Sequence, residues 1–333
     1  MYKKNVHKRK IQSVAVLCSG GDAPGMNAAI RAVVRSSIAE CLQVFGVVKG
    51  YTGLVEGDFV ELELASVANI IQRGGTILKT ARCPEFLRAN GRKQAADNLR
   101  NKGIDALVVI GGDGSFRGAH AFWKENKIPV IGVPGTIDND IAGTDITIGF
   151  DTAVNTALRA IDQVRDTASA HERTFLVEVM GRNSGNIALE VGIGGGAEAI
   201  VIPEEKMSPK EVAARIERGV RRGKTSSIIV VAEGDVPGGR AMQLAKELEK
   251  KYKIGAKVCI LGHVQRGGSP SALDRKIASV FGAEAIYSLL KGKSDLMVGI
   301  YGNKTVYVPF AKAVQKKNTI DRDLIKLAQV LAT

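Results

Sequence analysis

The stretch "SVAVLCSGGDAPGMNAAIR" (Ser13–Arg31) indicates the fold class, because its pattern changes in the middle. Ser13–Leu17 is a short apolar run, as in a strand buried on both faces. Gly20 and Gly21 follow, and a helical pattern then extends from Asn27 to Glu40. A buried strand, a glycine turn and a helix in this order predict one unit of a parallel α/β sheet.

The same order recurs along the chain. Further apolar runs, each followed by a polar motif with glycine, are "ALVVI" (Ala106–Ile110), "VIGV" (Val130–Val133), "FLVEVM" (Phe175–Met180), "IIVVA" (Ile228–Ala232) and "VCIL" (Val258–Leu261). Open α/β sheets bind ligands at the carboxyl ends of their strands, where these motifs fall. We therefore expect an α/β protein with a ligand site in a cleft, built from two domains.

One helix is expected over "DTAVNTALRAIDQVRD" (Asp151–Asp166). Asp151 or Thr152 is a suitable N-cap. Val154, Leu158, Ile161 and Val164 recur at helical spacing, which predicts that they form its buried face.

Composition excludes several classes of protein. The 333 residues are 45% hydrophobic, with no apolar run long enough for a membrane span and no secretory signal at the N-terminus. The four cysteines are widely spaced, which favours free thiols in the cytoplasm over a zinc site or a disulfide framework.

The net charge of +13 raises the alternative of a nucleic-acid-binding protein. Five of these charges lie in the N-terminal "MYKKNVHKRK", whose role the sequence does not give. The other basic residues are scattered, aromatic residues are only 5%, and no known binding motif is present, so this alternative is disfavoured.

Glycine motifs after strands suit phosphate, because backbone N–H groups and a helix N-terminus can approach an anion there. "SGGDAPG" (Ser19–Gly25) lacks the G-K-[ST] ending of a Walker A loop, and a plain tight turn would use similar residues. "GGDGS" (Gly111–Ser115) adds Asp113, a reasonable Mg²⁺ ligand, although an Asx turn is the alternative.

The loop "GTIDND" (Gly135–Asp140) is the second acidic motif. One of Asp138 and Asp140 can act as the general base while the other acts on the metal, and Thr136 can bond a phosphate. A capped turn in which both acids bond only backbone is the alternative. Arg182 and Arg266 follow strands directly and suit phosphate, since the guanidinium binds bidentately. Together these motifs are the parts that phosphoryl transfer needs.

In this order, "SGGDAPGMNAAIR", "RGGT", "GGDGS", "PGTIDNDI", "TDITIGFDTA", "VEVMGR" and "LGHVQRGGSP" resemble the ATP-dependent 6-phosphofructokinases of the bacterial type, from about Val14 to beyond Ala285. The resemblance implies two Rossmann-like three-layer α/β/α domains with the active site in the cleft between them. The larger, ATP-binding domain is expected at 1–148 plus 264–314. The smaller one, for fructose 6-phosphate, is expected at 149–263 plus 315–333.

The resemblance also implies roles for single residues. Asp138 is expected as the base, Arg182 as the group that stabilises charge in transfer, and Thr136 as a contact to the transferring phosphate. Asp113 and Asp140 would act on the Mg²⁺ side. The ATP site would be lined by Gly21, Arg82, Cys83, Gly112, Asp113, Gly114 and Ser115. Besides Thr136, Asp138 and Arg182, the sugar phosphate would be bound by Arg173, Met180, Gly181, Glu233, Lys257, His263 and Arg266.

Arg173 and Lys257 are expected to act from a neighbouring subunit of a homotetramer. The family usually has arginine at Lys257, and lysine lacks the bidentate fork, so weaker sugar-phosphate binding is expected. An effector site between subunits would use Arg31, Arg35, Arg165, Glu198, Arg222 and Lys224. Leu64 and Asn69 replace polar or charged residues that often complete it, which leaves the response to effectors open.

The donor is predicted from two positions. Pyrophosphate-using relatives tend to have Asp and Lys where this chain has Gly114 and Gly135. Small residues leave room for the rest of a nucleotide, which favours ATP over pyrophosphate. A non-catalytic regulatory paralogue is a further alternative, and the intact Asp113, Asp138 and Arg182 argue against it.

Overall fold

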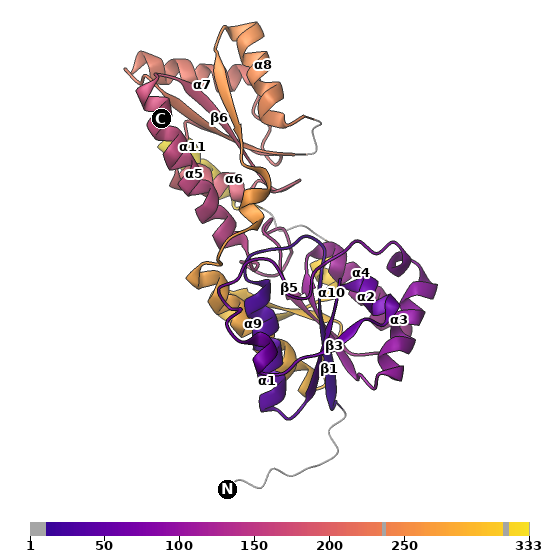
Figure 1. Cartoon of the computed structure of the whole chain (residues 1–333). Coiled ribbons are helices and arrows are strands. Elements are labelled where there is room, and N and C mark those ends of the chain that lie inside the picture. Colours follow the sequence, from indigo (N-terminus) through magenta and orange to yellow (C-terminus); the bar gives the residue numbers. More distant parts are fainter. Residues whose placement is uncertain (1–10, 235–237, 316–319, 333) are drawn as a thin grey trace. The chain divides into compact units, whose positions relative to one another are not determined.

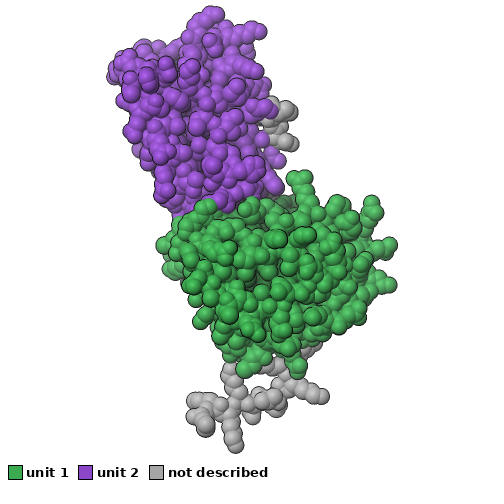
Figure 2. Space-filling view, in the orientation of Figure 1, with its two compact units in different colours: residues 1–136, 141–149, 268–318 green, residues 137–140, 150–267, 319–333 purple. Residues whose placement is uncertain are grey.

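The computed structural model describes residues 11–234, 238–315 and 320–332, and the basic N-terminal segment lies outside this part. The chain divides into two compact units (Figure 2). Unit 1 takes in residues 1–136, 141–149 and 268–318, and unit 2 takes in 137–140, 150–267 and 319–333. The chain thus passes from unit 1 to unit 2 between Thr136 and Ile137. The assignment of ATP and sugar phosphate to separate domains stays a prediction.

Unit 1 is built on a seven-stranded sheet of order β11-β10-β5-β4-β1-β2-β3. Its strands are β1 (Ser13–Ser19), β2 (Gln43–Val47), β3 (Phe59–Glu61), β4 (Ala106–Gly111), β5 (Val130–Pro134), β10 (Leu296–Tyr301) and β11 (Lys304–Pro309). The strands from β10 to β2 run parallel, whereas β3 and β11 pair antiparallel at the two edges. Helices cover both faces, which is why β1 and β4 are buried along their whole length.

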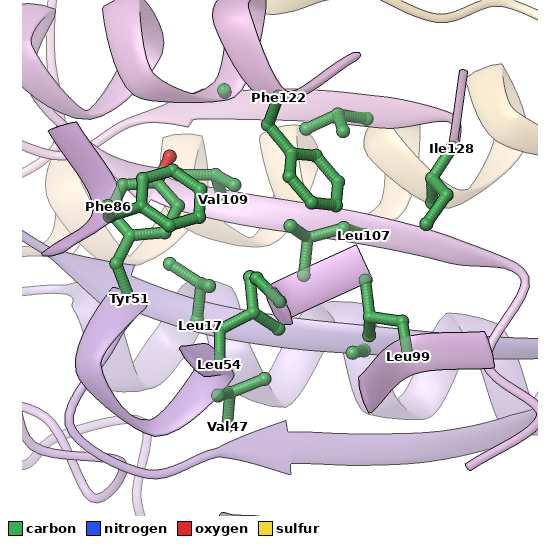
Figure 3. Close-up of a cluster of buried hydrophobic side chains, with 14 of the residues drawn as sticks. Leu17, Val47, Tyr51, Leu54, Phe86, Leu99, Leu107, Val109, Phe122 and Ile128 are labelled. Carbon is green, nitrogen blue, oxygen red and sulfur yellow. The ribbon is translucent and has the colours of Figure 1, made fainter. Parts of the chain in front are cut away.

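Two helices of unit 1, α1 and α9, pack on each other on one face of the sheet (Figure 1). The helical elements of unit 1 are α1 (Met26–Ala39), α2 (Tyr51–Glu56), η1 (Ala65–Val67), η2 (Glu85–Leu87), α3 (Ala89–Asn101), α4 (Asp113–Asn126), α9 (Ala272–Leu290) and α10 (Phe310–Ala313). On the other face, Tyr51 stacks on Phe86 with ring centroids 3.9 Å apart, and Phe122 packs beside them (Figure 3). This aromatic cluster joins α2, η2 and α4 beneath the glycine motifs.

Unit 2 has a parallel four-stranded sheet of order β7-β8-β6-β9. Its elements are α5 (Phe150–Ala170), β6 (Thr174–Val179), α6 (Asn186–Gly194), β7 (Ala199–Val201), α7 (Pro209–Arg221), β8 (Ser227–Ala232), α8 (Arg240–Tyr252), β9 (Ala256–Ile260), η3 (Gly262–Arg266) and α11 (Arg322–Leu331). Val212, Ile216 and Leu244 of α7 and α8 pack in a core with Ile229 and Val231 of β8. The predicted α/β class is confirmed. None of the described helices has both the length and the apolar composition of a membrane span.

The prediction for α5 is wrong in two details. The helix begins at Phe150, so Asp151 and Thr152 both lie in its first turn and neither is the N-cap. Its most buried side chains are Ala153, Ala157 and Ile161, whereas Leu158 is only half-buried. The apolar pattern contains two overlapping faces, and the one with small side chains is the more buried.

Candidate active site

The polar motifs of unit 1 meet at the carboxyl end of its sheet. The Ser115 hydroxyl, in the first turn of α4, donates to the carbonyl of Ser19 at the end of β1, 3.0 Å away. A Cβ built at Gly112 would lie 3.8 Å from the Cβ of Thr136, which follows β5. Thr80 donates to the Gly20 carbonyl at 2.8 Å. The structure therefore brings Gly21, Gly112–Ser115, Thr136 and the segment of Arg82 and Cys83 into one region.

Two helices start in this region, and both N-caps are glycines. α1 follows Gly25, whose φ of 103° is left-handed, and α4 follows Gly112. Because the cap residue has no side chain, neither helix has a capping hydrogen bond from its N-cap residue. Such an end carries partial positive charge and suits a phosphate.

Gly114 and Gly135 are glycines for different reasons. A Cβ at Gly114 would meet no atom within 4 Å, so this position opens to free space. A Cβ at Gly135 would lie 3.1 Å from Ile110 and 3.2 Å from Met26. Packing alone accounts for Gly135, and the argument that absent side chains leave room for a nucleotide depends on Gly114.

Asp113 is the first residue of α4. Its carboxylate accepts the Gly114 N–H at 2.7 Å and pairs with Arg117 at 2.6 Å. The described residues contain no group of three or more His, Cys, Asp or Glu side chains suited to a metal ion. Mg²⁺ does not need such a cage, because it keeps several waters and takes one or two carboxylates together with substrate phosphates. Half-buried Asp113, beside the glycine-capped end of α4, fits the requirement for one such carboxylate.

In unit 2, Asp138 lies close to Arg182, with the carboxylate Oδ2 4.0 Å from Nε. The Asp138 side chain is only 7% exposed, whereas that of Arg182 is 62% exposed. The pKa of Asp138 is raised to about 6, mainly by burial and also by the charges of Asp140 and Glu233, while Arg182 and Arg266 act to lower it. A carboxylate poised near neutral pH is a suitable general base.

Two side chains that sequence reasoning did not single out hold the Asp138 loop. Ser184 donates to the Asp138 carbonyl at 3.1 Å, and Asn186 donates to the Asn139 carbonyl at 2.8 Å. Asn139 and Arg182 both have left-handed φ, 48° and 52°, which is uncommon for residues other than glycine. Ser184 and Asn186 lie two and four residues after the "VEVMGR" motif, so their position after β6 was the available signal.

The remaining predicted side chains near Asp138 come from three strand ends. Glu233, after β8, accepts the backbone N–H of Arg182 at 2.9 Å. Met180 and Gly181 follow β6, and the Met180 N–H donates to Gln265 at 3.4 Å. Gln265, fully buried between His263 and Arg266 in η3, was also missed. These contacts place most of the predicted sugar-phosphate residues at the carboxyl end of the unit 2 sheet.

Arg173 and Lys257 lie elsewhere. Arg173 immediately precedes β6, and Lys257 pairs with Phe175 near the start of that strand. Met180 follows the other end of β6, about 20 Å from Arg173 at the usual rise per residue. Both basic side chains are exposed. Within one chain, Arg173 and Lys257 therefore do not lie near Asp138.

The predicted effector residues fall in two places. Arg31 and Arg35 lie on α1 of unit 1. In unit 2, Lys224 pairs with buried Glu198 at 3.0 Å, and Arg165 donates to the Gly196 carbonyl at 3.0 Å. Arg222 is exposed two residues before Lys224.

Two α/β units with glycine-capped helices in one and a buried carboxylate beside an arginine in the other have the features of a phosphotransferase. Residues 13–289 match the phosphofructokinase family, and the chain belongs to that family. It is 55% identical over 322 residues to "ATP-dependent 6-phosphofructokinase 1" of Thermus thermophilus, covering 97% of this chain and 100% of the relative. It is 53% identical to the "ATP-dependent 6-phosphofructokinase" of Thermotoga neapolitana over the same share of both chains.

Solved structures agree on the fold. The phosphofructokinase of Saccharomyces cerevisiae aligns with a TM-score of 0.84 and 38% identity, over 91% of this chain and 45% of the yeast chain. This chain therefore spans less than half of the yeast protein. A pyrophosphate-dependent phosphofructokinase from Marinobacter aquaeolei has a TM-score of 0.83 at 21% identity, covering 97% of this chain and 92% of that one. The latter likeness concerns the fold alone.

Proposed function

We propose that this protein is an ATP-dependent 6-phosphofructokinase, which transfers the γ-phosphoryl group of ATP to the 1-hydroxyl of fructose 6-phosphate. The observation that carries the proposal is buried Asp138, whose pKa is raised to about 6 beside Arg182. Asp138 takes the hydroxyl proton as the sugar oxygen bonds to the γ-phosphorus, and the bond to ADP breaks. Arg182 offsets the negative charge that spreads over the transferring group.

The glycine-capped ends of α1 and α4 would hold the ATP phosphates, with Arg82 and Cys83 beside them. Asp113 and Asp140 would hold Mg²⁺, which when bound neutralises phosphate charge. Thr136, one residue before unit 2 begins, would contact the transferring group. The open space at Gly114 supports a nucleotide donor over pyrophosphate.

Glu233, His263, Arg266, Met180 and Gly181 would bind fructose 6-phosphate. We propose that Arg173 and Lys257 serve the site of a neighbouring subunit in a homotetramer, because each is exposed and lies far from Asp138 in its own chain. The paired Glu198 and Lys224, with Arg165 close to Gly196, would bind an anionic effector together with Arg31, Arg35 and Arg222. We also propose a cytoplasmic location.

A coupled assay of ADP release by the purified protein tests the proposal. We expect ADP release that requires fructose 6-phosphate and Mg²⁺, with pyrophosphate unable to replace ATP. Turnover with pyrophosphate but not with ATP would contradict it. DNA binding that falls steeply with salt, without kinase activity, would favour a nucleic-acid-binding protein instead. Velocity curves with and without ADP and phosphoenolpyruvate test the effector site, and overlapping curves would reject it.

A further inference from the structure

The segment Thr147–Gly149 runs beside the loop that leads to Asp138. Gly135 and Ile148 form an isolated parallel bridge, which extends β5 beyond its end at Pro134. Ile148 donates its N–H to the Pro134 carbonyl at 2.9 Å and accepts the Thr136 N–H at 3.1 Å. The loop therefore continues to receive sheet-like support after the strand has ended.

Thr147 adds the contact that matters most for Thr136. Its side chain is fully buried, and its hydroxyl donates to the Thr136 carbonyl at 2.6 Å. The Thr136 N–H belongs to the peptide group before its Cα, and the carbonyl to the one after it. Both peptide groups are thus held by residues 147 and 148, which fixes the backbone angles of Thr136 and the direction of its side chain.

The supporting segment is itself held firmly in unit 1. The Gly149 N–H donates to the carboxylate of Asp274, 2.8 Å away, and Asp274 is fully buried in the first turn of α9. A Cβ at Gly25 would lie 2.6 Å from Ile148. The start of α1, the start of α9 and Thr147–Gly149 therefore pack without spare space.

We propose that Thr147 is a positioning residue for phosphoryl transfer, an inference that rests on the proposed function. Its hydroxyl holds the Thr136–Ile137 peptide group, so that Thr136 faces the transferring phosphate and Asp138, two residues on, faces the sugar hydroxyl. Because the Thr147 side chain is fully buried and so not available for a substrate to contact, we expect its loss to lower the rate of the chemical step and to leave substrate binding nearly unchanged.

The test compares Thr147→Val, which keeps the shape and removes the hydroxyl, with Thr147→Ser, which keeps the hydroxyl. We expect Thr147→Val to lower kcat by about tenfold or more, with both KM values within about twofold, because small misplacements of reacting groups are costly. Thr147→Ser should recover most of the rate. If the valine variant does not fold, Thr147→Ala takes its place with the same expectation.

Thr144→Val is the matched control. Thr144 is also buried, three residues before this segment, and its hydroxyl donates to the Ile146 carbonyl and accepts the Ile300 N–H. It should lose stability and keep the wild-type kcat at a temperature where it is folded. An equal fall in kcat for Thr144→Val, a serine variant as slow as valine, or a valine variant as fast as wild type would overturn the positioning role. An inactive wild-type protein would instead contradict the proposed function.

Discussion

The two units carry their candidate residues in different ways. Unit 1 presents backbone N–H groups at two glycine-capped helix ends, where a phosphate could bind. Its candidate ligand region also needs open space, such as that at Gly114. Unit 2 offers charged side chains, and it holds Asp138 where solvent is largely excluded. We therefore expect substitutions at the glycine-capped helix ends of unit 1 to act on donor binding, whereas substitutions of the charged residues around Asp138 in unit 2 act on the chemical step or on sugar binding.

The largest expected effect is that of Asp138→Asn, which removes the base and keeps the shape. We expect kcat to fall about 10²- to 10⁴-fold with little change in the KM for ATP, because general base catalysis contributes at that level. Steady-state ADP release measures both constants. A variant with more than about a tenth of the wild-type kcat would show that another group takes the proton.

Arg182→Ala is expected to come next. Its guanidinium lies 4.0 Å from Asp138 and is largely exposed, so the fold should tolerate its removal. We expect kcat to fall about 100-fold, as when one charge-stabilising donor is lost. Exposed Arg218 on α7 provides the control, and Arg218→Ala should keep wild-type kinetics. A rise in the KM for ATP alone would mean that Arg182 binds ATP, and it would contradict the assignment of unit 2 to the chemical step and to sugar binding.

The raised pKa of Asp138 also predicts how the free energy of unfolding depends on pH. Its pKa is raised to about 6 in the folded protein, so the folded state favours the protonated form. Its contribution is therefore fully favourable at low pH and is lost as pH rises through about 6. Asp138→Asn should be more stable than wild type at pH 8 by an amount on the order of 2–3 kcal/mol, and this advantage should vanish near pH 4. Thermal unfolding at the two pH values measures it, and a less stable variant at pH 8 would contradict the burial argument.

Gly114→Asp tests the donor side of the comparison. The position opens to free space, so a carboxylate fits without a clash but would repel the ATP phosphates. We expect the KM for ATP to rise about tenfold, as for one like-charge contact, with the KM for fructose 6-phosphate unchanged. Gly114→Asn controls for size and should have a smaller effect. Equal changes in both KM values would mean that the two units do not divide the substrates.

Lys257→Arg is expected to have the smallest effect. Arginine restores the bidentate fork, which should lower the KM for fructose 6-phosphate by about two- to fivefold and leave that for ATP unchanged. Lys253, four residues earlier and also exposed, supplies the control Lys253→Arg. An unchanged or higher KM for the sugar phosphate would remove the assigned role of Lys257.

The parallel strands β1, β4, β5, β6, β8 and β9 and the glycine motifs after them could be predicted because local patterns specify them, whereas the parallel strands β2, β7 and β10 were not predicted. β1 and β4 are continuous apolar runs that end at glycine, and such runs need no tertiary information. The antiparallel edge strands β3 and β11 were not predicted, since half-exposed strands lack that pattern. The packing reason for Gly135 depends on Ile110 and Met26, which are distant in sequence.

The candidate site likewise has some features that the sequence could predict and others that only the fold creates. Asp138 and Asp140 stand out in the sequence as acids two positions apart, but the raised pKa of Asp138 depends on burial that only the fold creates. Ser184, Asn186 and Thr147 act by donating hydrogen bonds to carbonyl groups of the loop. A hydroxyl or amide in a turn has many possible partners, so the sequence gives no reason to prefer one.

The central claim is tested most directly by identifying the products. Purified protein would be incubated with Mg²⁺, fructose 6-phosphate and ATP labelled in the γ-phosphate, and the sugar would be analysed by ³¹P NMR and by the position of the label. The account predicts equal amounts of ADP and of a sugar bisphosphate labelled at the 1-position, and no such product when pyrophosphate replaces ATP. Labelled inorganic phosphate with unmodified sugar, or a bisphosphate formed only from pyrophosphate, would contradict it.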